Sequence, residues 1–268
     1  MRFRRSALIT AGCGTLLALA GCSSGTTIGI STQPESSKPA PTIFNDAIAA
    51  MRKAKTVHLK GPITGIVFDA DLGGGNFSGT ATQGPSTFDI VYLAGAGGDP
   101  SKARIYLRAS AASWTAVSTA AFADCLGTGW LQLDAATAGT SAATPQGAAQ
   151  LAADARLLGN LPGLADALAS SPGTLTKGSV TSINGVNAVQ VNAAAVGGVF
   201  VATDGTPNIV RISGTSGSQT AALDFTNWDG GAQFNAPPAS RSLVTVLAGC
   251  PGVAATPASP TAPASPTP

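Results

Sequence analysis

Residues 42–67, TIFNDAIAAMRKAKTVHLKGPITGIV, change the spacing of their apolar side chains partway along the stretch. The first half carries an apolar stripe at helical spacing, made by Ile43, Phe44, Ala47, Ile48 and Met51. Such a stripe predicts an amphipathic helix that must bury one face against another element. Beyond residue 56 the period becomes two, and one face of a predicted strand carries Val57, Leu59, Ile63 and Val67. The stretch therefore predicts a helix followed by a strand whose apolar face lies against that helix.

Two glycines, Gly61 and Gly65, fall on the same face of this predicted strand. Glycine inside a strand is typical of a bend or of close approach by another group. We therefore expect the sheet to bend at these positions and to leave space beneath the helix. The side chains expected to line this cavity are Phe44, Ile48, Met51, Val57, Leu59, Ile63, Gly65 and Val67.

The rest of the chain alternates between strand and helix patterns. Strand patterns at 77–82, 87–93 and 103–109 predict an antiparallel meander with the first strand. Ala-rich helical patterns cover 111–124, 146–158 and 161–168, with a short extended piece at 129–133 and a loop of small residues at 135–145. Strand patterns return at 174–183, 186–191, 199–201, 209–212 and 221–228. This order predicts an α+β fold, with a few helices packed on one face of a curved antiparallel sheet, in a single domain.

The N-terminus reads as a secretory leader. Basic residues at 2, 4 and 5 precede an apolar run at 7–20, which is too short for a membrane span. The tetrad Leu19-Ala20-Gly21-Cys22 resembles the bacterial lipoprotein box. That resemblance implies cleavage before Cys22, acylation of its sulfur, and a lipid anchor on the outer face of the plasma membrane. The alternative is an ordinary secreted protein that is cleaved elsewhere.

Composition divides the chain into four parts. Residues 1–21 are the predicted signal peptide, and residues 22–41, rich in Ser, Thr, Gly and Pro, are a predicted flexible tether. Residues 42–250 form the predicted domain. Residues 251–268 consist almost wholly of Pro, Ala, Thr and Ser, so this tail is expected to be disordered.

The net charge bears on nucleic-acid binding, and the cysteine content bears on disulfide formation. Three of the 15 basic residues lie in the leader, which leaves 12 against 13 acidic residues, a net charge of about −1. No basic excess remains to indicate nucleic-acid binding. In an oxidising compartment Cys125 and Cys250 form an even pair, which favours a disulfide. The alternative is that both cysteines are buried free thiols. The sequence does not determine the oligomeric state.

Residues that carry chemistry are few, so we expect no enzyme, no metal and no cofactor. His58 is the only histidine and alternates with Lys60 in a strand pattern, which predicts a surface position. Asp69 and Asp71 lie near a glycine-rich turn. They could bind a cation, but aspartates that form turns are the commoner case.

A series of short motifs then gives a resemblance to a known family. The motifs, in chain order, are Ala54-Lys55-Thr56-Val57-His58-Leu59, Arg104-Ile105-Tyr106-Leu107, Ser113-Trp114, Gly129-Trp130-Leu131-Gln132-Leu133, Ile183-Asn184-Gly185-Val186 and Phe225-Thr226-Asn227-Trp228, followed by Pro237-Pro238. Their order and spacing resemble those of actinobacterial cell-envelope lipoproteins of the LppX/LprG type. The chain departs from this pattern in its cysteine pair, its Pro-rich tail and its glycine turn at 73–75.

The resemblance implies a half-barrel of antiparallel strands wrapped around helices, with an apolar cavity for acyl chains between them. It also implies an extracytoplasmic lipoprotein, anchored through Cys22, that binds or carries a lipid or lipoglycan. Burial of each CH₂ group contributes about 0.8 kcal/mol, so a long acyl chain binds without a polar anchor. The alternative function is an envelope scaffold or interaction module with a filled core and no ligand.

Overall fold

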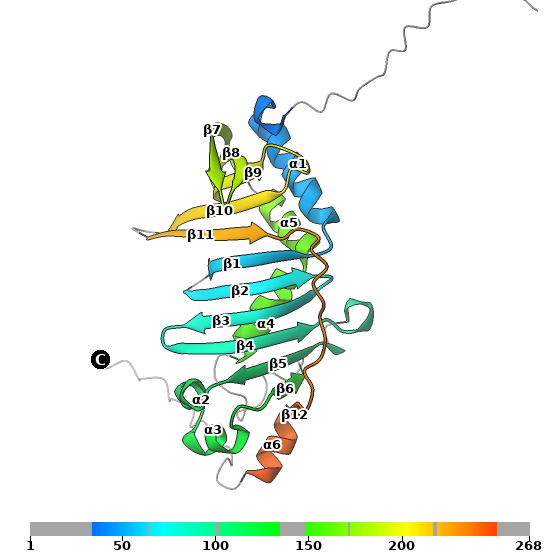
Figure 1. Ribbon diagram of the computed structural model, residues 1–268, viewed down its shortest axis with the longest axis vertical. Coiled ribbons are helices and arrows are strands. Elements are labelled where there is room, and N and C mark those ends of the chain that lie inside the picture. Colours follow the sequence, from blue (N-terminus) through cyan, green and yellow to red (C-terminus); the bar gives the residue numbers. More distant parts are fainter. Residues whose placement is uncertain are drawn as a thin grey trace, which may run out of the picture. The chain divides into compact units, whose positions relative to one another are not determined.

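The computed structural model describes residues 34–63, 65–99, 102–134, 148–170, 172–216 and 219–250 (Figure 1). They belong to one compact unit, Gln33–Pro268. The predicted signal peptide, Cys22 with most of the tether, the loop at 135–145 and the tail at 251–268 lie outside the described residues.

In the described residues, a single open sheet of twelve strands forms the framework, in the order β12-β6-β5-β4-β3-β2-β1-β11-β10-β9-β8-β7. All neighbouring strands pair antiparallel except β12 and β6, which pair in parallel. The strands are β1 (Val57–Ile63), β2 (Ile66–Gly73), β3 (Asn76–Gln83), β4 (Ser86–Leu93), β5 (Arg104–Ala109), β6 (Leu131–Asp134), β7 (Leu175–Ile183), β8 (Val186–Ala193), β9 (Gly197–Ala202), β10 (Ile209–Ser216), β11 (Gln219–Thr226) and β12 (Arg241–Ser242). The predicted α+β fold with a curved, mainly antiparallel sheet is confirmed.

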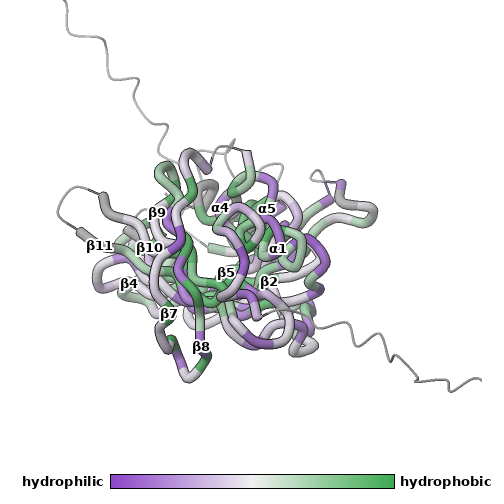
Figure 2. Tube along the Cα trace, turned by 90° about the horizontal axis from the view of Figure 1, so that it is seen from above, coloured by the Kyte–Doolittle hydropathy of each residue, from purple (hydrophilic) through white to green (hydrophobic). Residues whose placement is uncertain are grey.

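The helices comprise α1 (Ala40–Lys53), α2 (Ala111–Val117), α3 (Ala120–Leu126), α4 (Ala148–Gly159), α5 (Leu161–Ser170) and α6 (Leu243–Gly249), and two 3₁₀ turns, η1 (Glu35–Ser37) and η2 (Ala96–Gly98). Helix α1 packs against α5 and strands β7, β8 and β9, whereas α4 lies over β2, β3 and β4. Seen from above, α1, α4 and α5 lie on the same side of the strands (Figure 2). We call this face of the sheet the helix side and the opposite face the outer side.

The first strand differs from the sequence prediction. Residues 57–67 do not form one strand, because the chain turns back between Ile63 and Ile66, which pair with each other. Gly65 lies in this turn with φ = +86°, and a Cβ at that position would meet no atom within 4 Å. The turn resets the alternation, so Val67 is 44% exposed while Phe68 is fully buried. The prediction that Val67 lines a cavity beneath the helix is therefore wrong, and Gly65 lies in a turn and not inside the predicted strand.

The apolar stripe of α1 is buried as predicted, but on a different partner. Phe44, Ile48 and Met51 are almost fully buried in the core. The strands that α1 packs against are β7, β8 and β9, not chiefly β1, which follows it in the sequence. The packed chain also begins before residue 42, because the backbone N–H of Glu35 donates a hydrogen bond to the carbonyl of Thr203 (3.2 Å).

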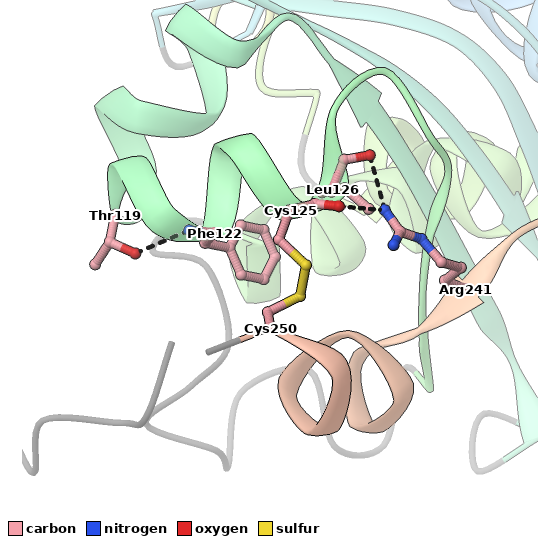
Figure 3. The surroundings of a disulfide bond; sticks show 6 residues. All are labelled: Thr119, Phe122, Cys125, Leu126, Arg241 and Cys250. Carbon is pink, nitrogen blue, oxygen red and sulfur yellow. Dashed lines mark hydrogen bonds between the residues drawn. A yellow bond between two sulfur atoms is a disulfide. The ribbon is translucent and has the colours of Figure 1, made fainter. Parts of the chain in front are cut away.

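The C-terminal part contains two elements that the sequence patterns did not indicate, β12 and α6. A segment without regular structure, residues 227–240, connects β11 to β12 across the sheet (Figure 1). Arg241 holds the C-terminal end of this segment against α3, because its Nη2 donates to the carbonyl oxygens of Cys125 and Leu126, both at 2.8 Å. Cys250, directly after α6, is bonded to Cys125 of α3, and their Cα atoms lie 5.8 Å apart (Figure 3).

Candidate functional site

An apolar layer between the sheet and the helices is the part of the molecule with binding potential. It holds Phe44, Ile48 and Met51 of α1, and Val57 and Leu59 of β1, in one buried cluster. The structure thus brings these five predicted cavity residues together. Their exposed fractions are 2% or less, which makes them part of a packed core.

The apolar layer reaches one end of the sheet, where some of the side chains that pack against it are partly accessible. This end carries the β1–β2, β3–β4, β8–β9 and β10–β11 connections and the passage from β5 into α2, and it is on the left in Figure 1. We call it the α2 end. Strand alternation there directs apolar side chains toward the helix side, so any gap in the covering helices leaves apolar surface accessible.

Several apolar side chains at the α2 end pack against the core but are only partly buried, among them Val117 of α2 and Leu175 of β7. Four others lie on β1, on the β8–β9 turn, on β10 and on β11; they are Ile63, Val196, Ile212 and Leu223, and we call these four the rim patch. Ile212 is paired directly with Leu223 in the sheet. Sequence analysis had selected only Ile63. The alternation of Leu223 with Phe225 was a usable signal, but which end of a strand stays open depends on the helices.

Gly61 explains how β1 and β11 come together beside the rim patch. Its φ is +142°, and a Cβ here would lie 2.2 Å from the carbonyl oxygen of Ala222. Only glycine permits this approach of the two strand backbones. Gly61 therefore marks close contact between strands, not the empty space beneath the helix that the sequence predicted.

The α2 end also contains an aromatic cluster. Trp114 of α2 makes edge contacts with Phe88 of β4 and Phe122 of α3, with ring centroids 5.5 and 5.7 Å apart. The Ser110 hydroxyl begins α2 by accepting a hydrogen bond from the backbone N–H of Ser113 (3.1 Å). This cap holds the helix so that the indole lies over β4.

The outer side has a different character, because charged side chains pair across its strands. His58 lies there between two carboxylates, with Nε2 3.0 Å from Asp69 Oδ1 and Nδ1 2.9 Å from Asp71 Oδ1. Lys60 Nζ lies 2.7 Å from Asp69 Oδ2. The two aspartates are therefore strand residues that pair with side chains of β1, Asp69 with Lys60 and Asp71 with His58, and they do not form a turn. Hydrogen bonding to Lys60 is the main cause that lowers the pKa of Asp69.

A bidentate pair joins β10 to β11 on the same face. The Arg211 guanidinium donates from both Nε and Nη2 to the two carboxylate oxygens of Asp224, the second bond being 2.9 Å long. This hydrogen bonding lowers the pKa of Asp224 and raises that of Arg211. The outer side thus pairs its charges internally, which favours a structural role for them over ligand binding.

Within the described ranges, no group of three or more His, Cys, Asp or Glu side chains is arranged to hold a metal ion. His58 illustrates the reason, since its two ring nitrogens contact different aspartates on opposite sides of the ring. In the same part of the chain, no helix is long and apolar enough to cross a membrane. The rim patch and the apolar layer behind it are the features left to interpret.

Comparison with known proteins shows that the chain is similar to solved structures but not to any family model or curated sequence. No family model and no curated protein matches the sequence. The crystal structure of LprF from Mycobacterium bovis matches over 74% of this chain and 98% of that chain, with 13% identity and a TM-score of 0.49. That of the Mycobacterium tuberculosis lipoprotein LppX matches over 73% of this chain and 99% of that chain, with 16% identity and a TM-score of 0.40. The resemblance predicted from the order of the sequence motifs is thus found among solved structures, where the chain is similar to LprF and to the lipoprotein LppX.

Proposed function

We propose that this protein is anchored to the outer face of the plasma membrane through acylated Cys22 and binds a lipid or lipoglycan by its acyl chains. The rim patch is the observation that carries the proposal. Its apolar side chains are continuous with the core and remain partly accessible. Apolar surface that continues into a buried layer is what an acyl chain requires.

The placement of the patch supports entry of a chain at the α2 end. Ile212 and Leu223 face the helix side, because Ile212 pairs with the buried Val199 and Leu223 lies two residues from the buried Phe225 on the same strand. A chain entering beside them would lie along the sheet beneath the helices, where it meets only apolar side chains. The polar headgroup would stay outside, and neither catalysis nor a cofactor is needed for this role.

The anchor gives the binding site its location. The leader and the tetrad Leu19-Ala20-Gly21-Cys22 support export and acylation. An acylated Cys22 would stand 11 residues before Gln33, where the compact unit begins. An extended stretch of this length spans at most about 40 Å, so the anchored domain stays close to the membrane from which it would take a lipid.

The test compares two neighbouring positions on β11. Leu223→Asp places a charge in the rim patch, whereas Ala222→Asp places the same charge on the outer side of the same strand. Both variants and the parent protein, produced without the lipid anchor, are extracted with organic solvent and the extract is examined by mass spectrometry. Lipid in the parent and in Ala222→Asp, but not in Leu223→Asp, is the expected result.

Two outcomes contradict the proposal. If the parent contains no lipid and takes up none from vesicles, the chain is an envelope scaffold with a filled core. If both variants retain lipid as the parent does, a lipid is bound elsewhere and the rim patch is not its site. Thermal unfolding of each variant shows whether the fold has survived the added charge.

A further inference from the structure

The indole N–H of Trp114 is buried without a hydrogen-bond partner. The residue is 0% exposed, and its Nε1 atom has no acceptor within hydrogen-bonding distance. Trp228 provides the contrast, because its Nε1 donates to the carbonyl of Ile209 at 3.0 Å. Buried tryptophan N–H groups usually find such a partner, so the exception at Trp114 requires an explanation.

Packing alone does not account for a tryptophan at this position. A phenylalanine would keep the edge contacts with Phe88 and Phe122 and would bury no polar group. The other buried polar side chain of α2, Ser113, has its partners, since its hydroxyl lies 3.1 Å from that of Ser110 and accepts from the N–H of Thr87. An unpaired buried donor costs free energy, and here that donor is an indole N–H with apolar neighbours.

Trp114 lies at the same end of the molecule as the rim patch. The β1–β2 and β3–β4 turns lie at one end of the meander, so Ile63 and Phe88 are both close to the α2 end. Three strand spacings separate β1 from β4, which is about 14 Å, and five separate β10 from β4, which is about 24 Å. A lipid whose linkage carbonyl meets Trp114 would therefore need an acyl chain that runs across β3 and β2 to reach the rim patch.

The chemistry of the surroundings limits what the N–H can bind. Trp114 stands among aromatic rings, and the nearby buried polar side chain Ser113 is already bonded. The missing partner is thus an acceptor that enters an apolar site without a charge. In a lipid the groups that meet this condition are the ester or amide carbonyl oxygens that join the acyl chains to the polar part.

We propose that the Trp114 indole N–H donates a hydrogen bond to a carbonyl oxygen of the bound acyl lipid and so fixes the depth of its chains. This inference rests on the proposed function, and it adds a preference for ester- or amide-linked chains over ether-linked chains. Helix α2, of seven residues, carries Trp114 and would have to shift to admit the carbonyl, whereas α3 is held by the Cys125–Cys250 bond.

The test uses two lipids that differ only in the carbonyl: a diacyl phosphatidylcholine and the dialkyl ether with the same chains and headgroup. Binding to the delipidated mature domain is measured for the parent, for Trp114→Phe and for the control Trp228→Phe. The parent and the control should prefer the ester by about twofold to tenfold, the value of one net hydrogen bond. Trp114→Phe should bind both lipids equally.

A second measurement needs no variant to fold. In protein labelled with ¹⁵N-tryptophan, the Trp114 N–H resonance should move downfield with the ester lipid and not with the ether. Equal affinity of the parent for the two lipids, or an unmoved resonance in a lipid-bound protein, would overturn the inference. If the Trp114 N–H already donates to the ring face of Phe88 or Phe122, its resonance would not move when a lipid binds. Absence of binding by either lipid would instead overturn the proposed function itself.

Discussion

The bond between Cys125 and Cys250 should make a large contribution to stability, which follows from its position in the chain. It joins α3 to the residue after α6, at a sequence separation of 125 residues. In the chain-entropy account, closing a loop of this length raises the free energy of unfolding by about 5 kcal/mol. In a domain of about 200 residues each kcal/mol corresponds to roughly 2–4 °C in Tm, so loss of the bond should lower Tm by about 10–20 °C.

The structure adds a local effect to this global one. Without the bond, the segment from Arg241 to Cys250 is held by the two-residue strand β12, by the buried Val246 and by the Arg241 hydrogen bonds. These contacts are few for a segment that must be ordered at about 1–2 kcal/mol per residue. We therefore expect α6 to open locally well below the temperature at which the sheet unfolds.

The perturbation is the double variant Cys125→Ser with Cys250→Ser, which leaves no single thiol behind. Thermal unfolding gives the global effect, and amide hydrogen exchange in α6 gives the local one. The parent protein treated with dithiothreitol should reproduce both results. A fall in Tm of less than about 3 °C, or two thiols that titrate in the unfolded, non-reduced parent, would refute the reasoning.

Three further predictions concern separate parts of the molecule. Hydrogen bonding to Arg211 lowers the pKa of Asp224 below its ordinary value of 3.8, so the pair stabilises the fold above that pH and the stabilisation is lost as the pH falls through the lowered pKa. Asp224→Asn should accordingly reduce stability at pH 7 and flatten its fall in acid, as measured by urea unfolding from pH 7 to about pH 2; an unchanged acid profile would contradict this. Gly61→Ala places a Cβ against the β11 backbone and should cost about 1–3 kcal/mol, whereas Gly249→Ala, with open space at its Cβ, should change stability by less than about 0.5 kcal/mol. Equal effects of the two alanines would disprove the close approach. Cys22→Ala should abolish acylation and move the protein from the detergent phase to the aqueous phase, and continued membrane partitioning would exclude the lipoprotein interpretation.

Local patterns were sufficient for most of the elements. The stripe of Phe44, Ile48 and Met51 predicted a helix with one buried face, and that face is buried. The turn Asn184-Gly185 predicted the β7–β8 hairpin, and both residues have positive φ, 51° and 80°. These predictions hold because a helical period and a two-residue turn depend on side chains only a few positions apart.

The sequence predictions failed where one local pattern of residues was compatible with two different structures. Val57, Leu59, Ile63 and Val67 fit one continuous strand, yet the chain reverses at Gly65 and places Val67 outside. Once a turn is inserted, the alternation starts again with a new phase. The aspartates of β2 were misread for the same reason, since a glycine turn two residues away obscured their place in a strand.

The sequence by itself determined the α+β class, most of the helices and strands, and the apolar faces that had to be buried, and it predicted the leader. Only the tertiary structure decided which of those faces meet. Helix α1 packs against β7–β9, more than 100 residues away in the chain, and β1 lies in the same part of the sheet as Leu223 and Ile212 only because it pairs with β11. The hydrophobic effect is not directional, and it does not depend on how far apart two residues lie in the sequence. Any apolar face could therefore have served as the packing partner of another. Strand pairing and the close approach at Gly61 select one arrangement, and that arrangement leaves the rim patch partly uncovered.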